Sequence, residues 1–190
     1  MLKQVSSKET EEILRIAGDC LAWDGDFVEL GCYEGDTSLL LAELLKKEKS
    51  DKKLWVYDSF EGLPEKTRED FSESGRDFQK GELFVTKRFV KQRFLRANLP
   101  VPVIKKAWFN ELSDLDLPEK ISFAFLDGDF YESIRDSLRL IENKMVPGGV
   151  IIVHDYENPA LPGVLRAVSE WNKEQNLKIE TCQSMAILEV

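Results

Sequence analysis

Short apolar runs of strand length alternate with helical patterns along the chain, and this alternation constrains the fold more than any other feature. The runs lie at residues 27–30, 54–57, 101–104, 121–126 and 150–153. Apolar residues with helical spacing precede, separate or follow them, at residues 6–21, 38–45, 83–95, 134–141 and 164–171. Strands that alternate with helices predict a parallel sheet covered on both faces.

Signals at the ends of these segments refine the prediction. Ser6 and Glu9 have the spacing of a capping box at the start of the first helix. The run 147–149, Pro-Gly-Gly, is expected to end the helix that passes through residues 134–141. Residues 178–182 and 185–188 predict a closing pair of strands that adds an antiparallel strand at one edge. The expected fold is therefore a doubly wound, mostly parallel α/β sheet of seven strands.

The size and charge of the chain limit its organisation and its partners. A length of 190 residues fits a single domain, residues 1–190, whose core needs no disulfide or metal to hold it. The formal net charge of −9 argues against nucleic acid or an anionic membrane as a partner, because both require clustered Lys and Arg. A homo-oligomer is compatible with everything in the sequence, as is a monomer.

The cysteines and the apolar runs indicate the cellular compartment of the protein. Cys20, Cys32 and Cys182 are odd in number, widely spaced and without a C-x-x-C pair, which favours reduced thiols over a disulfide framework or a zinc site. No apolar run has the length of a membrane span, and residues 1–10 lack the apolar stretch of a secretion signal. We expect a cytoplasmic protein.

Residues 61–81 differ from the rest of the chain. The segment is rich in acidic, basic and glycine residues and has almost no periodicity. Because it is too long for an ordinary connection, it is expected to be either a functional lid over a site or a partly disordered insertion.

A glycine-containing loop follows the first predicted strand. In a doubly wound sheet ligands bind beyond the carboxyl ends of the strands, and residues 29–37 there read ELGCYEGDT. Gly31 and Gly35 allow a tight turn and close approach of a ligand, and the following helix offers free N–H groups. The loop lacks the G-x-G-x-x-G fingerprint, has Tyr33 in place of a middle glycine, and carries Glu29, which suits a positively charged ligand. Taken alone, it is equally compatible with an ordinary turn.

Asp58 follows the second predicted strand and strengthens the case for a ligand. A carboxylate at this distance after the loop can accept hydrogen bonds from both ribose hydroxyls. Asp-Ser also favours a solvent-facing turn, but the loop and the carboxylate together point to a nucleoside-type cofactor. After the third predicted strand, Trp108 and Phe109 are candidates to wall an adenine pocket, or to pack in the core.

Polar residues also follow the fourth and fifth predicted strands. Asp127 and Asp129 flank a glycine directly after a run of apolar residues, where carboxylates rarely lie without a partner or a task. His154, the only histidine in the chain, and Asp155 follow the neighbouring strand. A lone histidine is more often a structural hydrogen-bonding residue. Next to Asp155 and opposite Asp127, however, His154 predicts either a metal site or an acid–base site.

Several of these stretches resemble a known family. The runs VELGCYEG, VYDSFEGLP, AFLDGDFYES, VPGGVIIVHDY and PGVLRAVSEW, from Val28 to Trp171, are similar to class I methyltransferases, and within them to the macrocin O-methyltransferase family. DSFEGLP and LDGDFYES are fairly specific to this family, whereas the glycine loop is shared widely. The resemblance implies a Rossmann-like fold, S-adenosylmethionine as methyl donor, and a sugar or polyphenol-like hydroxyl as acceptor.

The resemblance also implies roles for individual residues. Glu29, Gly31, Tyr33 and Gly35 would line the methionine end of the cofactor, and Thr37 would hold its carboxylate. The ribose and adenine would be bound by a second group, which consists of Asp58, Phe60, Ala107, Trp108 and Asp127. In relatives the first aspartate of LDGD and an Asp-Asp pair after the fifth strand bind a divalent cation, usually magnesium.

One position departs from the family pattern. His154 replaces the first aspartate of that pair, so the implied ligands are Asp127, His154 and Asp155. An imidazole weakens selectivity for magnesium and favours Mn, Fe or Zn. Alternatively the site holds no metal, and His154 acts as a general base near neutral pH. In the first case Asp127 would remove the proton from the acceptor hydroxyl.

Two rival functions share parts of this pattern. A nicotinamide-dependent oxidoreductase would share the fold and the ribose carboxylate, but the absence of G-x-G-x-x-G disfavours it. A non-catalytic sensor of S-adenosylmethionine would need the cofactor site without Asp127, His154 and Asp155, whose presence disfavours that reading. The acceptor itself cannot be read from the sequence, because fold says little about substrate.

Overall fold

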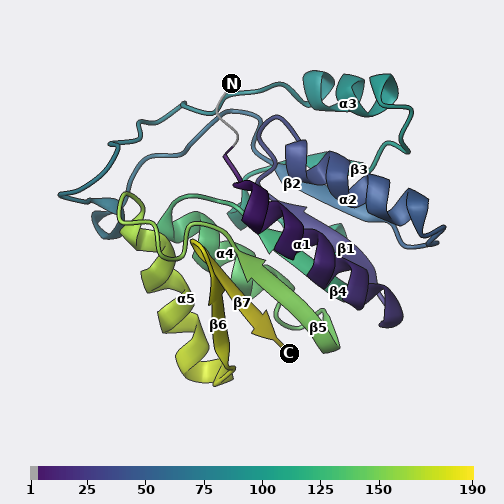
Figure 1. Ribbon diagram of the computed structural model, residues 1–190. Coiled ribbons are helices and arrows are strands. Elements are labelled where there is room, and N and C mark those ends of the chain that lie inside the picture. Colours follow the sequence, from purple (N-terminus) through teal and green to yellow (C-terminus); the bar gives the residue numbers. More distant parts are fainter. Residues whose placement is uncertain (1–3) are drawn as a thin grey trace.

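A computed structural model describes residues 4–190, and in it seven strands form one sheet in the order β3-β2-β1-β4-β5-β7-β6 (Figure 1). The first five strands pair in parallel, whereas β7 runs antiparallel to both β5 and β6. The antiparallel pair therefore lies at one edge, and the expected doubly wound sheet is confirmed. The strands are β1 (Asp26–Leu30), β2 (Leu54–Asp58), β3 (Val103–Lys106), β4 (Ile121–Leu126), β5 (Met145–Val153), β6 (Ile179–Cys182) and β7 (Met185–Glu189).

Helices cover both faces of this sheet (Figure 1). Side chains alternate between the faces along each strand, so that Val28 packs towards α4 and α5 and Phe27 packs towards α1, α2 and α3. All six residues of β4 are buried, as expected for a central strand covered on both sides. The helices are α1 (Ser7–Asp19), α2 (Asp36–Lys47), α3 (Lys87–Arg96), α4 (Tyr131–Ile141) and α5 (Pro162–Gln175).

Local capping explains where several helices begin. The capping box predicted for α1 is present: the Ser6 hydroxyl accepts the N–H of Glu9, and the Glu9 carboxylate accepts the N–H of Ser6. Helix α3 begins at Lys87, four residues later than its apolar pattern suggests. The reason is Thr86, whose hydroxyl accepts the N–H of Phe89 and so caps the helix there.

The position of β3 and the start of β5 also differ from the sequence prediction. Strand β3 is shifted to residues 103–106, because it pairs on one side only and its register is set by β2. Helix α4 ends at Ile141, and the Pro147-Gly148-Gly149 run lies inside β5 instead of ending the helix. Gly148 has a φ of 80° and packs on Trp23, where a Cβ would approach an indole carbon to 2.8 Å. Gly148 therefore allows the irregular backbone at the start of β5 and its close contact with Trp23.

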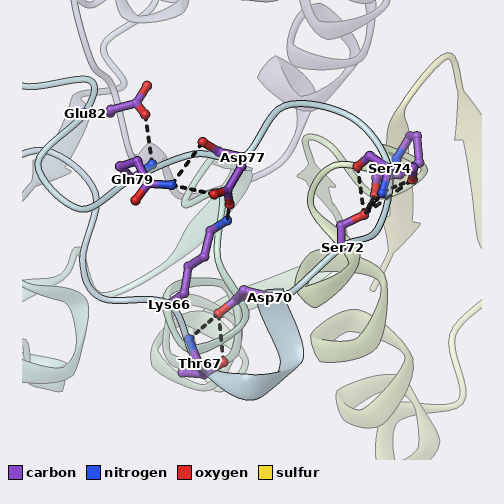
Figure 2. A network of polar contacts seen from close by, with 9 residues as sticks. Lys66, Thr67, Asp70, Ser72, Ser74, Asp77, Gln79 and Glu82 are labelled. Carbon is purple, nitrogen blue, oxygen red and sulfur yellow. Dashed lines mark hydrogen bonds and ion pairs between the residues drawn. The ribbon is translucent and has the colours of Figure 1, made fainter.

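The segment 61–81 contains a single short 3-10 helix, Arg68–Asp70, and otherwise has irregular structure. Figure 2 shows its internal polar contacts: Lys66 pairs with Asp77, and the Asp70 carboxylate accepts the N–H and hydroxyl of Thr67 at 2.8 and 2.7 Å. The other oxygen of Asp70 accepts the N–H of Tyr131, at the start of α4, at 2.6 Å. Asp70 is 1% exposed. Its contacts attach the first half of this segment to the domain.

A second attachment lies further along the same segment. The hydroxyl of Ser72 donates to the carbonyl of Pro159 at 2.5 Å, in the loop before α5. Gly75 packs directly on Ala160, which a Cβ on Gly75 would approach to 2.6 Å. The segment thus runs over the amino ends of α4 and α5.

Within residues 4–190, no helix combines the length and apolar character needed to cross a bilayer. Cys20, Cys32 and Cys182 form no disulfide with one another.

Candidate active site

The predicted site residues meet because backbone hydrogen bonds of the sheet continue one residue past the strands. The N–H of Gly31 donates to Tyr57, that of Asp127 to Leu30, and that of His154 to Leu126, at 2.9, 2.8 and 2.9 Å. The carboxyl ends of β1, β2, β4 and β5 therefore carry their following residues to one edge of the sheet. This is where ligands bind in doubly wound folds.

Gly31 is required by the close approach of β1 and β4. Its φ is +89°, and a Cβ on it would lie 2.0 Å from the carbonyl oxygen of Asp127. Only glycine combines this backbone conformation with such a contact. The glycine therefore brings the loop after β1 against the carboxylate loop after β4.

Asp58 organises the same loop. Its Oδ2 accepts the N–H groups of Cys32 and Tyr33 at 2.9 and 3.2 Å, and its Oδ1 accepts the N–H of Phe60 at 2.7 Å. Each carboxylate oxygen has about two lone-pair sites, so Oδ1 retains one for a further donor. Asp58 also helps to line a cavity.

Two adjoining cavities lie over these strand ends, and both are lined by Gln4, Tyr33, Leu83 and Asp127. The smaller cavity has a wall of apolar and aromatic groups beside Asp58 and Gly31. Ala107, Trp108 and Phe109 belong to this wall, where the sequence placed an aromatic pocket. Asp127 lies at the junction of the two cavities.

The larger cavity measures about 640 Å³, within the range of small-molecule sites. It is lined by Glu29 and by Thr37 in the first turn of α2, together with residues of the loop after β1. Arg76 of the 61–81 segment pairs at its wall with Glu82, which directly follows that segment. The cavity thus extends from the glycine loop to the irregular segment.

Glu29 is an acid buried at the base of the larger cavity, with 1% of its surface exposed. Burial raises its pKa to about 8, and the charges of Asp127 and Asp58 act in the same direction. The hydroxyl of Ser38 donates to it and partly offsets these effects. A cationic ligand beside Glu29 would favour the ionised form and lower this pKa again.

Asp127, His154 and Asp155 form a compact donor cluster. The Nδ1 atom of His154 lies 3.0 Å from Oδ1 of Asp127 and 3.1 Å from Oδ2 of Asp155, and one ligand atom of each residue lies within 4.8 Å of the others. An octahedral cation with ligands at about 2.1 Å holds adjacent donors about 3 Å apart. The residues therefore fit a divalent cation, and the imidazole suits a borderline metal better than magnesium.

The protonation state of His154 determines whether this residue could act as a general base, the alternative to a metal ligand. Burial by itself would lower its pKa, but the charge of Asp127 and the hydrogen bonds with Asp127, Asp155 and Glu9 raise the pKa well above the usual range. A histidine that already holds both protons at neutral pH cannot accept another. The raised pKa argues against His154 as a general base and fits a structural donor, and Nδ1 would have to release its proton to ligate a cation.

Four predicted site residues line neither cavity: Gly35, Phe60, His154 and Asp155. Phe60 is 4% exposed and packs in the core with α1 to α3, and Gly35 is the N-cap of α2 with a φ of 81°. The ring of His154 is 4% exposed and reaches the cavities only through Asp127.

Two buried acids near the site were not predicted as part of it. Glu9 was recognised only as a helix cap, yet its Oε2 lies 3.9 Å from Nε2 of His154. Asp70 was recognised only as part of an irregular segment. The partners of Glu9 and Asp70 are 175 and 61 residues away in sequence, at Ser184 and Tyr131. No local pattern could have shown these contacts.

A sheet in this order, with a glycine loop and an acid after its first two parallel strands, is the Rossmann-like architecture of class I methyltransferases. The chain belongs to the macrocin O-methyltransferase (TylF) family, whose model matches residues 10–186. The resemblance inferred from the sequence motifs is thereby confirmed.

Individual relatives agree with this assignment. The 8-demethyl-8-(2,3-dimethoxy-alpha-L-rhamnosyl)-tetracenomycin-C 4'-O-methyltransferase of Streptomyces olivaceus is 30% identical over 138 residues, 70% of this chain and 53% of the relative. The solved structure of the O-methyltransferase NovP superposes with a TM-score of 0.84 at 25% identity, covering 98% of this chain and 81% of that one.

A third comparison extends the likeness in fold. The O-methyltransferase TomG from Streptomyces achromogenes, solved in complex with SAM, gives a TM-score of 0.65 at 16% identity and covers 98% of this chain and 81% of that one. The chain spans 53% to 63% of the length of the curated relatives that it matches.

Proposed function

We propose that the chain is an S-adenosylmethionine-dependent O-methyltransferase that acts on a hydroxyl of a small molecule, sugar-like or polyphenol-like. The observation that carries this proposal is the position of Asp127 between two adjoining cavities, one beside Asp58 and one beside Glu29. Family membership supports the reaction, and the curated relatives are O-methyltransferases by name.

The groups that line the smaller cavity suit the nucleoside half of the cofactor. The free lone pair on Oδ1 of Asp58 would accept a ribose hydroxyl. Ala107, Trp108 and Phe109 would cover the adenine ring with apolar surface. The loop at Gly31 stays close to the ligand because Asp58 holds its N–H groups.

The larger cavity suits the amino-acid half and the acceptor. Glu29 and Tyr33 would face the positive end of the cofactor, and Thr37 at the amino end of α2 would face its carboxylate. Arg76 and Glu82 at the outer wall would contact the acceptor. Residues 61–81 would thus act as the wall that shapes this cavity, attached to the domain through Asp70 and Ser72.

The reaction requires the acceptor hydroxyl to lose a proton and to align with the methyl group. S-adenosylmethionine supplies an electrophilic methyl on a sulfonium centre. Asp127, which lines both cavities, would accept the hydroxyl proton. Fixing two reactants in line can supply up to about 7–11 kcal/mol of the acceleration.

A divalent cation would bind to Asp127, His154 and Asp155, with Mn, Fe or Zn preferred over Mg. Such a cation acts as a Lewis acid that makes a bound hydroxyl more acidic. The charge of −9 and the size of the larger cavity support a small-molecule acceptor without nucleic acid as a partner. The odd number and wide spacing of the cysteines support a cytoplasmic enzyme.

Calorimetric titration tests the cofactor. We expect heat of binding with S-adenosylmethionine and none with NAD, and the reverse result would overturn the proposal. Asp127→Asn tests catalysis: cofactor binding should persist while methyl transfer to a panel of sugars and phenols collapses. Equal transfer by Asp127→Asn would instead remove Asp127 from the reaction.

A further inference from the structure

Glu9 is a buried acid that the proposed reaction does not use. It lies in the first turn of α1, and only 4% of its surface is exposed. Its Oε1 accepts the hydroxyl and the N–H of Ser184 at 2.7 and 3.2 Å, in the turn between β6 and β7. Its Oε2 accepts the N–H of Ser6 at 2.9 Å and lies 3.9 Å from Nε2 of His154.

These contacts exceed what a helix cap requires. A capping box uses one carboxylate oxygen and normally lies at the surface. Here the second oxygen is held by Ser184, and the whole group is enclosed next to His154. Burying a carboxylate is unfavourable unless it is paired and hydrogen-bonded. Its burial therefore indicates a role beyond the cap.

The two nitrogens of His154 face opposite partners. Nδ1 lies 3.0 and 3.1 Å from the carboxylates of Asp127 and Asp155, whereas Nε2 lies 3.9 Å from Oε2 of Glu9, within ion-pair distance but beyond a direct hydrogen bond. The ring is enclosed, with that of Phe125 tilted beside it at 6.1 Å between centroids. In metal sites the second ring nitrogen of a ligating histidine usually donates to a carboxylate, which fixes the ring and its tautomer.

We propose that Glu9 is a positioning residue for His154. It holds the imidazole so that Nδ1 lies between Asp127 and Asp155 as the third donor to a divalent cation. The inference rests on the proposed function, because it assigns Glu9 to the cation site of that enzyme. Helix α1, the β6–β7 turn and the end of β5 thereby meet at a single ring.

The chain itself provides a specific probe. His154 is the only histidine, so untagged protein labelled with ¹⁵N-histidine gives ring signals from this residue alone. On addition of Zn²⁺ we expect the Nδ1 signal to shift strongly and the Nε2 signal to keep its protonated character. Calorimetry on the same samples gives the Zn²⁺ affinity without any turnover.

Glu9→Ala should weaken Zn²⁺ binding about 10–100-fold, the usual effect of losing such a partner, and the ring signals should show exchange between tautomers. Glu9→Gln retains an acceptor oxygen for Nε2 and should recover part of the affinity. Ser6→Ala is the matched control, since it weakens the cap of α1 but leaves the Glu9 carboxylate in place. It should bind Zn²⁺ like the wild type.

Three results would overturn the inference: wild-type protein that binds no Zn²⁺, Glu9→Ala with wild-type affinity, or Ser6→Ala with an equal loss. Titration of the same samples with S-adenosylmethionine keeps the two proposals apart. Failure of the wild type to bind it would overturn the proposed function. Normal cofactor binding with an unchanged Glu9→Ala affinity for Zn²⁺ would overturn the role of Glu9 alone.

Discussion

At the scale of single residues, burial decides the charge that Glu29 carries. The side chain is enclosed beneath the larger cavity, and its pKa rises from 4.5 to about 8 because water is excluded and the charges of Asp127 and Asp58 are near. Near neutral pH the group is mostly protonated. The folded protein then binds a proton that the unfolded chain releases, so this group's contribution to stability falls as pH rises from about 4.5 to 8.

This proton should be coupled to cofactor binding. A cation beside Glu29 favours its ionised form, so binding of S-adenosylmethionine at pH 7 should release a proton, and affinity should increase as pH rises towards about 8. Calorimetry in buffers of different ionisation enthalpy measures the release. Glu29→Gln should abolish it. An equal proton release from wild type and Glu29→Gln would show that another group is responsible.

At the scale of elements, the loops after β1 and β4 are held together by a contact that leaves no room for a side chain. Gly31→Ala places a Cβ 2.0 Å from the carbonyl oxygen of Asp127, in a left-handed conformation that costs about 1–3 kcal/mol by itself. We expect the free energy of unfolding to fall by at least that amount in urea titrations, with loss of cofactor binding.

Gly18→Ala in α1 is the matched control for this substitution. No atom lies within 4 Å of its added Cβ, and alanine in a helix is about 0.5–1 kcal/mol more favourable than glycine. The control should therefore be neutral or more stable. If Gly31→Ala behaved like Gly18→Ala, the contact between the two loops would not be required.

The irregular segment 61–81 depends on one buried carboxylate. Asp70→Ala leaves the N–H groups of Thr67 and Tyr131 without their acceptor, which should lower the free energy of unfolding by about 2–4 kcal/mol. Amide exchange at Tyr131 should accelerate. Asp77→Ala removes an exposed partner of Lys66 and Gln79 and should change stability little. Similar effects of the two substitutions would argue against Asp70 as the main attachment.

At the scale of the whole molecule, one sheet carries the core on both faces and the site at one edge. A ligand that spans the strand ends of β1, β2 and β4 should therefore stabilise the entire fold. At 100 times its Kd, S-adenosylmethionine adds about 2.7 kcal/mol. For a domain of this size that raises Tm by about 5–10 °C. Differential scanning calorimetry measures the shift, and NAD at the same concentration should leave Tm unchanged.

The strand boundaries predicted from the sequence agree best with the structure where the strand is buried. Strands β1, β4 and the end of β5 were predicted to within a residue, because central strands covered on both faces are continuous apolar runs. Strand β3 was misplaced by two residues. It lies at the sheet edge, where Val101 and Val103 are 37% and 42% exposed and apolarity no longer marks the paired residues.

The sequence by itself determined the α/β class, the glycine loop, and the acids at the strand ends, because strand spacing and turn residues are local properties. Only the tertiary structure decided that Asp127 lies between two cavities, that Asp70 fixes the 61–81 segment, and that Glu9 faces His154. The last two contacts join residues 61 or more positions apart. Such contacts depend on how helices dock on the sheet, and no local pattern in the chain encodes that docking.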